Sequence, residues 1–212
     1  MIEWFDNHCH LPENPEEEIL RARKELVVGF VNVGTDLETS RMAKEKAKIF
    51  SDVWSTAGVH PHEARKGIEG IKDLLKDSNV VAVGEAGLDY HYDHSPREDQ
   101  NRVFAEHIEM AHTSNLPLVI HTREAWEETF KILDSEGVPE STVFHCFTGG
   151  KDEAKECLKR GAYLSFSGII TFKKSELLRE AASECPLDRA MIETDSPYLT
   201  PVFHGQIHAF LR

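Results

Sequence analysis

Features that would assign the chain at once to a familiar class are missing from its sequence. No apolar run approaches the roughly 20 residues that a membrane-spanning helix needs. The amino-terminal stretch, MIEWFDNHCH, contains no basic region followed by an apolar segment, so we expect no secretory signal, no membrane partner and a cytoplasmic location. The four cysteines form no CxxC pair, which argues against a disulfide scaffold or a zinc ribbon.

Basic residues are too few for a protein that holds nucleic acid by charge alone. The 212 residues include 24 Lys and Arg against 37 Asp and Glu, so the net charge is −13. Broad capture of a polynucleotide depends on many basic contacts to phosphates and is disfavoured by this balance. A phosphodiester substrate stays open, because bound metal ions reverse the sign of the local field. The 12 histidines are many for this length, and their positions are informative.

Nucleotide-binding glycine loops are absent too, since neither GxGxxG nor GxxxxGK[ST] follows an apolar run. The apolar runs are short and alternate with amphipathic segments, which predicts buried parallel strands joined by helices. The predicted strands are Ile2–Asn7, Val27–Gly34, Val53–Val59, Val80–Glu85, Pro117–His121, Thr142–His145, Ala162–Ser167 and Ala190–Thr194. Eight such units predict an α/β fold with a single domain over residues 1–212, a (β/α)8 TIM barrel, in preference to an open doubly wound sheet.

The segment after the eighth predicted strand is short. Too few residues follow Thr194 for a loop and a full helix. We therefore expect a barrel that lacks its final helix, with one flank bare or covered by a second copy in a homo-oligomer.

Polar side chains stand where several predicted strands end. His8 and His10 close the first strand and point to the same face, because side chains alternate along a strand. Two imidazoles on one face are half of a site for zinc or another transition metal, although a pair of ordinary surface histidines explains this motif alone equally well. Glu85 ends an apolar run and lies between glycines. Burying its carboxylate is costly unless it forms an ion pair with a lysine or arginine or binds a metal.

Three further side chains follow apolar runs in the same way. His121 and His145 end the fifth and sixth predicted strands, and Asp195 follows the eighth. Taken alone, each histidine is more often a buried structural residue, and Asp195 could cap a turn; in a metal site, Asp195 could orient or deprotonate an attacking water. The carboxyl ends of barrel strands meet at one mouth, where active sites lie. We therefore expect one metal-binding cluster made of His8, His10, Glu85, His121, His145 and Asp195.

Other basic side chains are candidates for contact with substrate. His60 and His62 lie in a GVHPH turn after the third predicted strand, and Arg123 lies two residues beyond His121. The planar guanidinium of Arg123 suits phosphate oxygens, although a surface ion pair explains it nearly as well. We expect all three side chains to line the pocket.

Together the motifs resemble those of the TatD-like metal-dependent deoxyribonucleases. The matching segments are DNHCHL, GVHPH, GEAGLDYH, PLVIHTREA, FHCFTG and ETDSPYLTPV, in order from Asp6 to Val202. After Pro201 the sequence departs from the family, whose members usually continue with an Arg-Gly segment and a last helix.

The resemblance implies specific roles for the residues of the cluster. It implies two divalent ions, Mg, Mn or Zn, with His8 and His10 on one, His121 and His145 on the other, and Glu85 shared between them. Asp195 would be a further ligand and handle the proton of the attacking water, while His60, His62 and Arg123 would meet the substrate. That substrate would be DNA, cut internally or from a 3′ end by a water that two metals activate.

Two other interpretations stay open. An amidohydrolase or phosphotriesterase-like enzyme for a small molecule would share the His-x-His pair and the last-strand Asp, but such enzymes often bridge their metals with a modified lysine. This chain has Glu85 on the fourth strand and no lysine at a run end, which favours the nuclease. A barrel without its last helix could also be inactive or depend on an oligomer.

Overall fold

The strands expected from the sequence all form, and they pair in the order of the chain. The computed structural model describes residues 1–202, in which eight parallel strands make one sheet in the order β1 to β8. The strands are β1 (Trp4–Cys9), β2 (Val27–Asn32), β3 (Val53–Ala57), β4 (Val80–Asp89), β5 (Leu118–Arg123), β6 (Thr142–Phe144), β7 (Tyr163–Phe166) and β8 (Ala190–Ile192). The (β/α)8 barrel is thereby confirmed.

The barrel closes between its first and last strands through the segment that follows β8. The backbone N–H of Asp195 donates to the carbonyl of His8 over 3.0 Å. The N–H of His10 donates to the carbonyl of Ser196 over 2.7 Å. The two ends of the sheet are therefore joined at the point where polar residues were predicted to gather.

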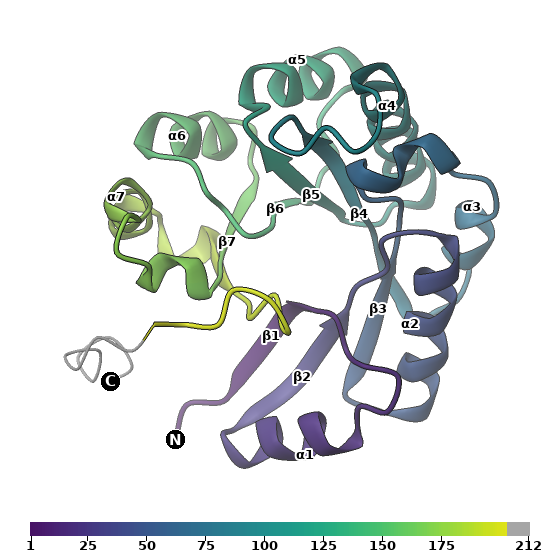
Figure 1. Cartoon of the computed structure of the whole chain (residues 1–212), viewed down its shortest axis with the longest axis vertical. Coiled ribbons are helices and arrows are strands. Elements are labelled where there is room, and N and C mark those ends of the chain that lie inside the picture. Colours follow the sequence, from purple (N-terminus) through teal and green to yellow (C-terminus); the bar gives the residue numbers. More distant parts are fainter. Residues whose placement is uncertain (203–212) are drawn as a thin grey trace.

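Helices lie outside the sheet and connect successive strands (Figure 1). The α-helices of residues 1–202 are α1 (Glu16–Lys24), α2 (Leu37–Ile49), α3 (Ile71–Leu74), α4 (Arg97–Ser114), α5 (Trp126–Glu136), α6 (Lys151–Lys159) and α7 (Glu176–Glu184). Short 3-10 helices add to the connections: η1 (Pro61–Lys66), η2 (Gly168–Thr171) and η3 (Leu187–Arg189). None of the helices in this described part of the chain is both long enough and apolar enough to cross a membrane.

One large apolar core fixes the strands against the helices. Leu118, Phe144 and Leu164 contribute from the strands, and Phe104 and Ile108 contribute from α4; all five side chains are fully buried. Burying a side chain of this size contributes about 1.5–3 kcal/mol. The strand ends that carry the polar residues therefore project from a tightly packed scaffold.

The flank between β8 and β1 carries exposed apolar side chains. Phe5 on β1 is 42% exposed and Ile192 on β8 is 46% exposed. No helix follows β8 within residues 1–202. The predicted absence of a final helix also concerns residues 203–212, which lie outside the described residues. The homo-oligomer and the single domain over residues 1–212 stay predictions.

The fourth strand is longer than the sequence predicted. It continues to Asp89 instead of ending at Glu85, with a shift in its register against β5 between Val83 and Ala86. Glu85 therefore lies inside the strand at an irregular point of the pairing, and Asp89 ends it. An irregularity of this kind re-aims side chains, and it leaves no mark on the apolar pattern.

Candidate metal centre

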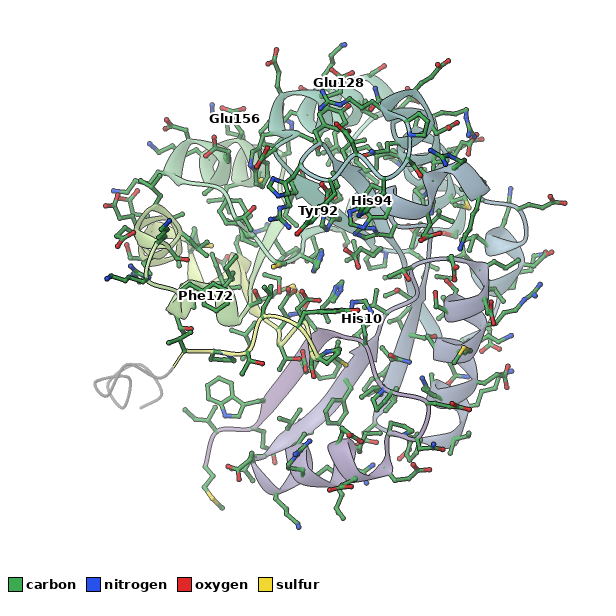
Figure 2. The ribbon with its side chains drawn as sticks, viewed as in Figure 1. His10, Tyr92, His94, Glu128, Glu156 and Phe172 are labelled. Carbon is green, nitrogen blue, oxygen red and sulfur yellow. The ribbon has the colours of Figure 1, made fainter. Side chains whose placement is uncertain are left out.

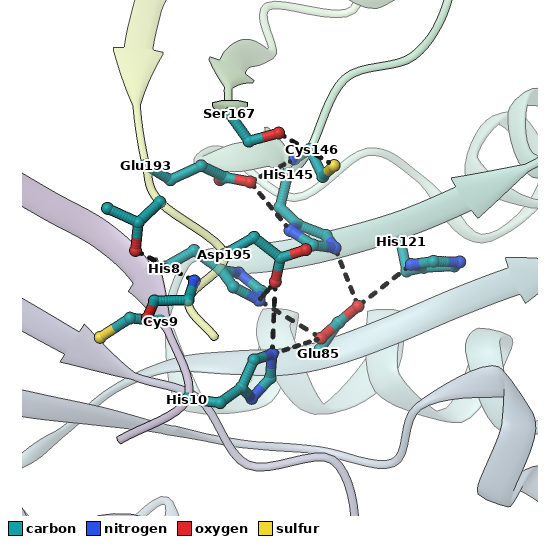
Figure 3. A network of polar contacts seen from close by, with 12 residues as sticks. His8, Cys9, His10, Glu85, His121, His145, Cys146, Ser167, Glu193 and Asp195 are labelled. Carbon is teal, nitrogen blue, oxygen red and sulfur yellow. Dashed lines mark hydrogen bonds and ion pairs between the residues drawn. The ribbon is translucent and has the colours of Figure 1, made fainter. Parts of the chain in front are cut away.

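Six side chains that the sequence predicts at strand ends meet at one mouth of the barrel (Figure 3). They are His8 and His10 at the end of β1, Glu85 in β4, His121 in β5, His145 directly after β6 and Asp195 after β8. The fold thus brings all six together, although they come from five different strand regions.

Glu85 lies at the centre of the cluster and is only 3% exposed. Its Oε2 atom is 3.3 Å from Nε2 of His8 and 4.0 Å from Nε2 of His10. Its Oε1 atom is 2.8 Å from Nε2 of His145 and 3.1 Å from Nδ1 of His121. The two oxygens of one carboxylate therefore face two different groups of histidines.

Asp195 belongs to the side of the cluster formed by His8 and His10. Its Oδ1 atom is 3.5 Å from Nε2 of His10 and 3.8 Å from Nε2 of His8. The backbone of Asp195 has a φ of 53°, a left-handed conformation that is unfavourable for residues other than glycine. Cys146 and Leu199, which line the same cavity, are also left-handed. Such strain gathers at functional sites because the surrounding structure must hold it in place.

The three predicted substrate contacts lie at different depths. His60 is part of the cluster itself, with Nε2 3.4 Å from Oε1 of Glu85. His62 lies one layer further out, with Nε2 2.9 Å from Oδ2 of Asp89. Arg123 lines the cavity and makes no ion pair with any residue of 1–202. The position of His60 makes it a further candidate ligand.

Unpaired nitrogens give the cluster the character of a metal site. Both ring nitrogens of His8 and Nε2 of His145 are buried and have no hydrogen-bond partner among the described residues. Nε2 of His145 is close to Glu85, but the two groups are not aligned for a hydrogen bond. Three sets of ligand atoms have all members within 4.8 Å of one another: His8–His10–Glu85, His60–Glu85–His121 and His8–His145–Glu193. Buried polar atoms are normally paired, so nitrogens that converge without pairing fit a divalent cation.

Opposite charges balance inside the cluster. Burial by itself raises the pKa of Glu85, but the charges of His145 and His60 outweigh it and hold this pKa well below its usual value. Burial by itself lowers the pKa of His145, and the charges of Glu85 and Glu193 reverse this and raise it well above its usual value. Glu85 is therefore ionised, as a metal ligand has to be.

Asp89 is a buried carboxylate that the sequence analysis did not single out. Its Oδ2 atom is 3.2 Å from Nε2 of His121 and 2.9 Å from Nε2 of His62. Gln100 accepts the N–H of Asp89 over 2.8 Å and so fixes the end of β4. Because Nδ1 of His121 faces Glu85, Asp89 holds the opposite nitrogen, which fixes the ring orientation of a ligating histidine.

Glu193 is a second carboxylate that was missed, and it acts on His145 in the same way. Its Oε1 atom is 3.2 Å from Nδ1 of His145 and accepts the N–H of Cys146 over 2.8 Å. Its Oε2 atom accepts the hydroxyl of Ser165. The alternation of side chains could have revealed Glu193, since it precedes Asp195 by two residues near the end of β8.

A cavity of about 1220 Å³ opens over the cluster. This exceeds the roughly 300–1,000 Å³ that is usual for a small-molecule pocket. Figure 2 looks into the mouth, with Tyr92 and His94 above His10 and Phe172 to its left. The site therefore has room for a segment of a polymer.

The fold and the cluster define a metal-dependent hydrolase, and comparison with known proteins agrees. The family model described as TatD related DNase matches residues 5–209. The chain belongs to this family, which confirms the resemblance seen in the motifs.

Individual relatives cover most of the chain. It is 42% identical over 207 residues to the uncharacterized metal-dependent hydrolase YabD of Bacillus subtilis, covering 93% of this chain and 81% of YabD. It is 38% identical over 193 residues to the 3′-5′ ssDNA/RNA exonuclease TatD of Cronobacter turicensis, covering 88% of this chain and 73% of that protein. The crystal structure of the TatD homologue YjjV from Escherichia coli superimposes with a TM-score of 0.86 at 26% identity, covering 96% of this chain and 83% of YjjV.

Proposed function

We propose that this hydrolase cleaves phosphodiester bonds of DNA with two divalent cations held in the cluster. The observation that carries the proposal is the position of Glu85, whose two oxygens face separate groups of histidines. One cation would lie between Glu85 and the side formed by His8, His10 and Asp195. The other would lie between Glu85 and the side formed by His121 and His145. Mg, Mn and Zn are all compatible with such mixed nitrogen and oxygen ligands.

The residues of the cluster divide the chemistry among them. When bound, the cations lower the pKa of a water molecule and neutralise charge on the phosphate. The carboxylate of Asp195 orients that water and accepts its proton. The guanidinium of Arg123 donates to phosphate oxygens, for which its planar fork is suited. His62 contacts the substrate from the side of Asp89. His60, expected from the sequence to contact the substrate too, lies beside Glu85 and is a further candidate ligand.

A nucleic acid substrate agrees with the size of the cavity and with the name of the Cronobacter relative, an exonuclease for single-stranded DNA and RNA. Cleavage within the strand and cleavage from its 3′ end both remain part of the proposal. The cytoplasmic location expected from the sequence stays a prediction.

A nuclease assay tests the proposal. Metal-depleted protein reloaded with Mn, Mg or Zn is incubated with single-stranded DNA labelled at its 5′ end, and the fragments are separated by length. Glu85→Ala and His121→Ala are expected to abolish metal-dependent cleavage while the protein remains folded. His112→Ala is the control, because this histidine lies on α4 and does not line the cavity; its ring is hydrogen-bonded to the Gly137 carbonyl. Undiminished cleavage by both cluster variants would contradict the assignment.

The two rival interpretations have less support. Of the described residues that line the cavity, the one lysine is Lys46 on α2, whose Nζ donates to the carbonyl of Leu11 over 2.8 Å. It lies on a helix, whereas the modified lysine of an amidohydrolase stands at a strand end. An inactive barrel is tested by metal analysis, since less than one equivalent after loading would favour it.

A further inference from the structure

The cavity has two sides of different chemistry. On the side of His121 it is lined by Arg123 and His62. On the side of His10 it is lined by Ile169 in η2 and Phe172 directly after it, and by Tyr198 and Leu199, which follow β8. We call these last four residues the apolar wall. A ligand that fills the cavity therefore meets the polar groups of Arg123 and His62, beside the ring of Tyr92, at one end and a mostly apolar surface at the other.

The two segments of the apolar wall are held against each other. The N–H of Val202 donates to the hydroxyl of Thr171 over 2.8 Å. A Cβ atom added at Gly168 would lie 2.2 Å from the carbonyl oxygen of Leu199, so the backbones approach as closely as glycine allows. The segment around η2 and the segment after β8 therefore form one surface and are not two independent loops.

Tyr198 joins the apolar wall to the cluster. Its ring centroid lies 5.7 Å from that of His10, with an angle of 70° between the ring planes. Its backbone N–H donates to the carbonyl of Asp195 over 2.8 Å. Despite these contacts, the side chain is 62% exposed. An aromatic ring is therefore held beside two proposed ligands while much of its surface stays open to a substrate.

We propose that the apolar wall binds a nucleobase adjacent to the scissile phosphate, with Tyr198 and Phe172 providing the stacking surface. This inference rests on the proposed function, and it adds which part of the nucleotide each side of the cavity receives. The phosphate lies over the cluster, the base lies on the apolar wall, and the next part of the backbone lies toward Arg123. Aromatic side chains accept any base in this way, because every base has a flat π face.

Because the base lies on the apolar wall, we expect the preferred substrate to have unpaired bases. A base can stack on a protein ring only after it has left its neighbours in a duplex, which costs a few kcal/mol for a paired base and little for one in a single strand. The apolar wall therefore favours single-stranded ends or loops over intact duplex DNA.

The experiment compares two single-stranded oligomers of equal length, one of thymidine and one of abasic deoxyribose phosphate. Both have the same backbone charge, so their ratio of kcat/KM isolates the contribution of the base. We expect the wild-type protein to prefer the thymidine oligomer by about 10-fold or more, the size of one stacking contact. Tyr198→Ala and Phe172→Ala are expected to bring this ratio toward one, chiefly through KM, and Tyr198→Phe is expected to retain it.

Tyr92→Ala is the matched control for the ratio. Tyr92 lines the same cavity and is 50% exposed, but it lies on the side of Arg123, so the preference for the base should persist. A wild-type ratio near one, or a ratio left unchanged by both Tyr198→Ala and Phe172→Ala, would overturn the base subsite while leaving the nuclease intact. If the wild-type protein cleaves neither oligomer with any of the three metals, the proposed function fails and the inference falls with it.

Discussion

Glu193→Gln tests whether a carboxylate behind the cluster controls metal binding. Glu193 is 7% exposed, and its Oε1 atom contacts both Nδ1 of His145 and the N–H of Cys146. Glutamine has the same shape and keeps an oxygen for both contacts. The change therefore removes one charge and puts an amide nitrogen where Oε2 accepts the Ser165 hydroxyl. Loss of such a partner of a ligating histidine typically weakens metal affinity or activity 10- to 100-fold, which is about 1.4–2.7 kcal/mol.

The assay is a titration of metal-free protein with Zn or Mn in competition with a chelator, together with thermal unfolding. Glu193→Ala serves as a comparison, because it also leaves the buried N–H of Cys146 without an acceptor and should cost about 1–3 kcal/mol of stability. Glu184→Gln is the control: this exposed carboxylate at the end of α7 pairs with Lys151, 2.7 Å away, and should leave metal affinity unchanged. Wild-type affinity and wild-type activity in Glu193→Gln would show that this carboxylate does not control metal binding.

Further predictions concern the second histidine pair, the substrate contacts and the scaffold. Asp89→Asn removes the charge that orients His121, so metal affinity should fall 10- to 100-fold in the same titration; an unchanged affinity would contradict that role. Arg123→Ala should raise KM for DNA more than it lowers kcat, and a fall in kcat alone would count against a phosphate contact. Apart from the histidines, the basic residues that line the cavity among residues 1–202 are Lys46 and Arg123. The logarithm of the association constant for single-stranded DNA should therefore fall with the logarithm of salt concentration at a shallow slope, about −1.4 for two phosphate contacts. A slope several times steeper would indicate binding over a wider surface. Burial lowers the pKa of His107 to about 4 from 6.5, so the unfolded chain binds the proton more readily than the folded protein does. As the pH falls from about 6.5 to 4, the folded protein should therefore lose about 3 kcal/mol of stability. His107→Gln should remove this part of the pH dependence in urea unfolding, and an identical dependence in both proteins would contradict it.

The parts of the site that follow from strand periodicity could be predicted from the sequence. His8 and His10 share a face because they are two residues apart in a strand, and His121 and His145 end apolar runs of clear length. Parallel strands of a barrel bring such ends to one mouth. Once the fold class was predicted correctly, it followed that these side chains would lie close together.

The parts that depend on irregular backbone could not be predicted in the same way. Past its register shift, β4 continues to Asp89, which holds His121 and His62, although the apolar pattern indicated an end at Glu85. The depth of His60 was hidden by the proline beside it, which predicts a turn and gives no direction for the side chains.

Anomalous diffraction from crystals of this protein loaded with Mn or Zn shows directly whether two cations bind at the cluster. We expect two peaks about 3.5–4 Å apart on opposite sides of the Glu85 carboxylate. One should lie about 2.0–2.2 Å from nitrogen atoms of His8 and His10, and the other should lie at the same distance from His121 and His145. A single peak remote from Glu85, or no peak among these side chains after loading, would contradict a two-metal site at Glu85.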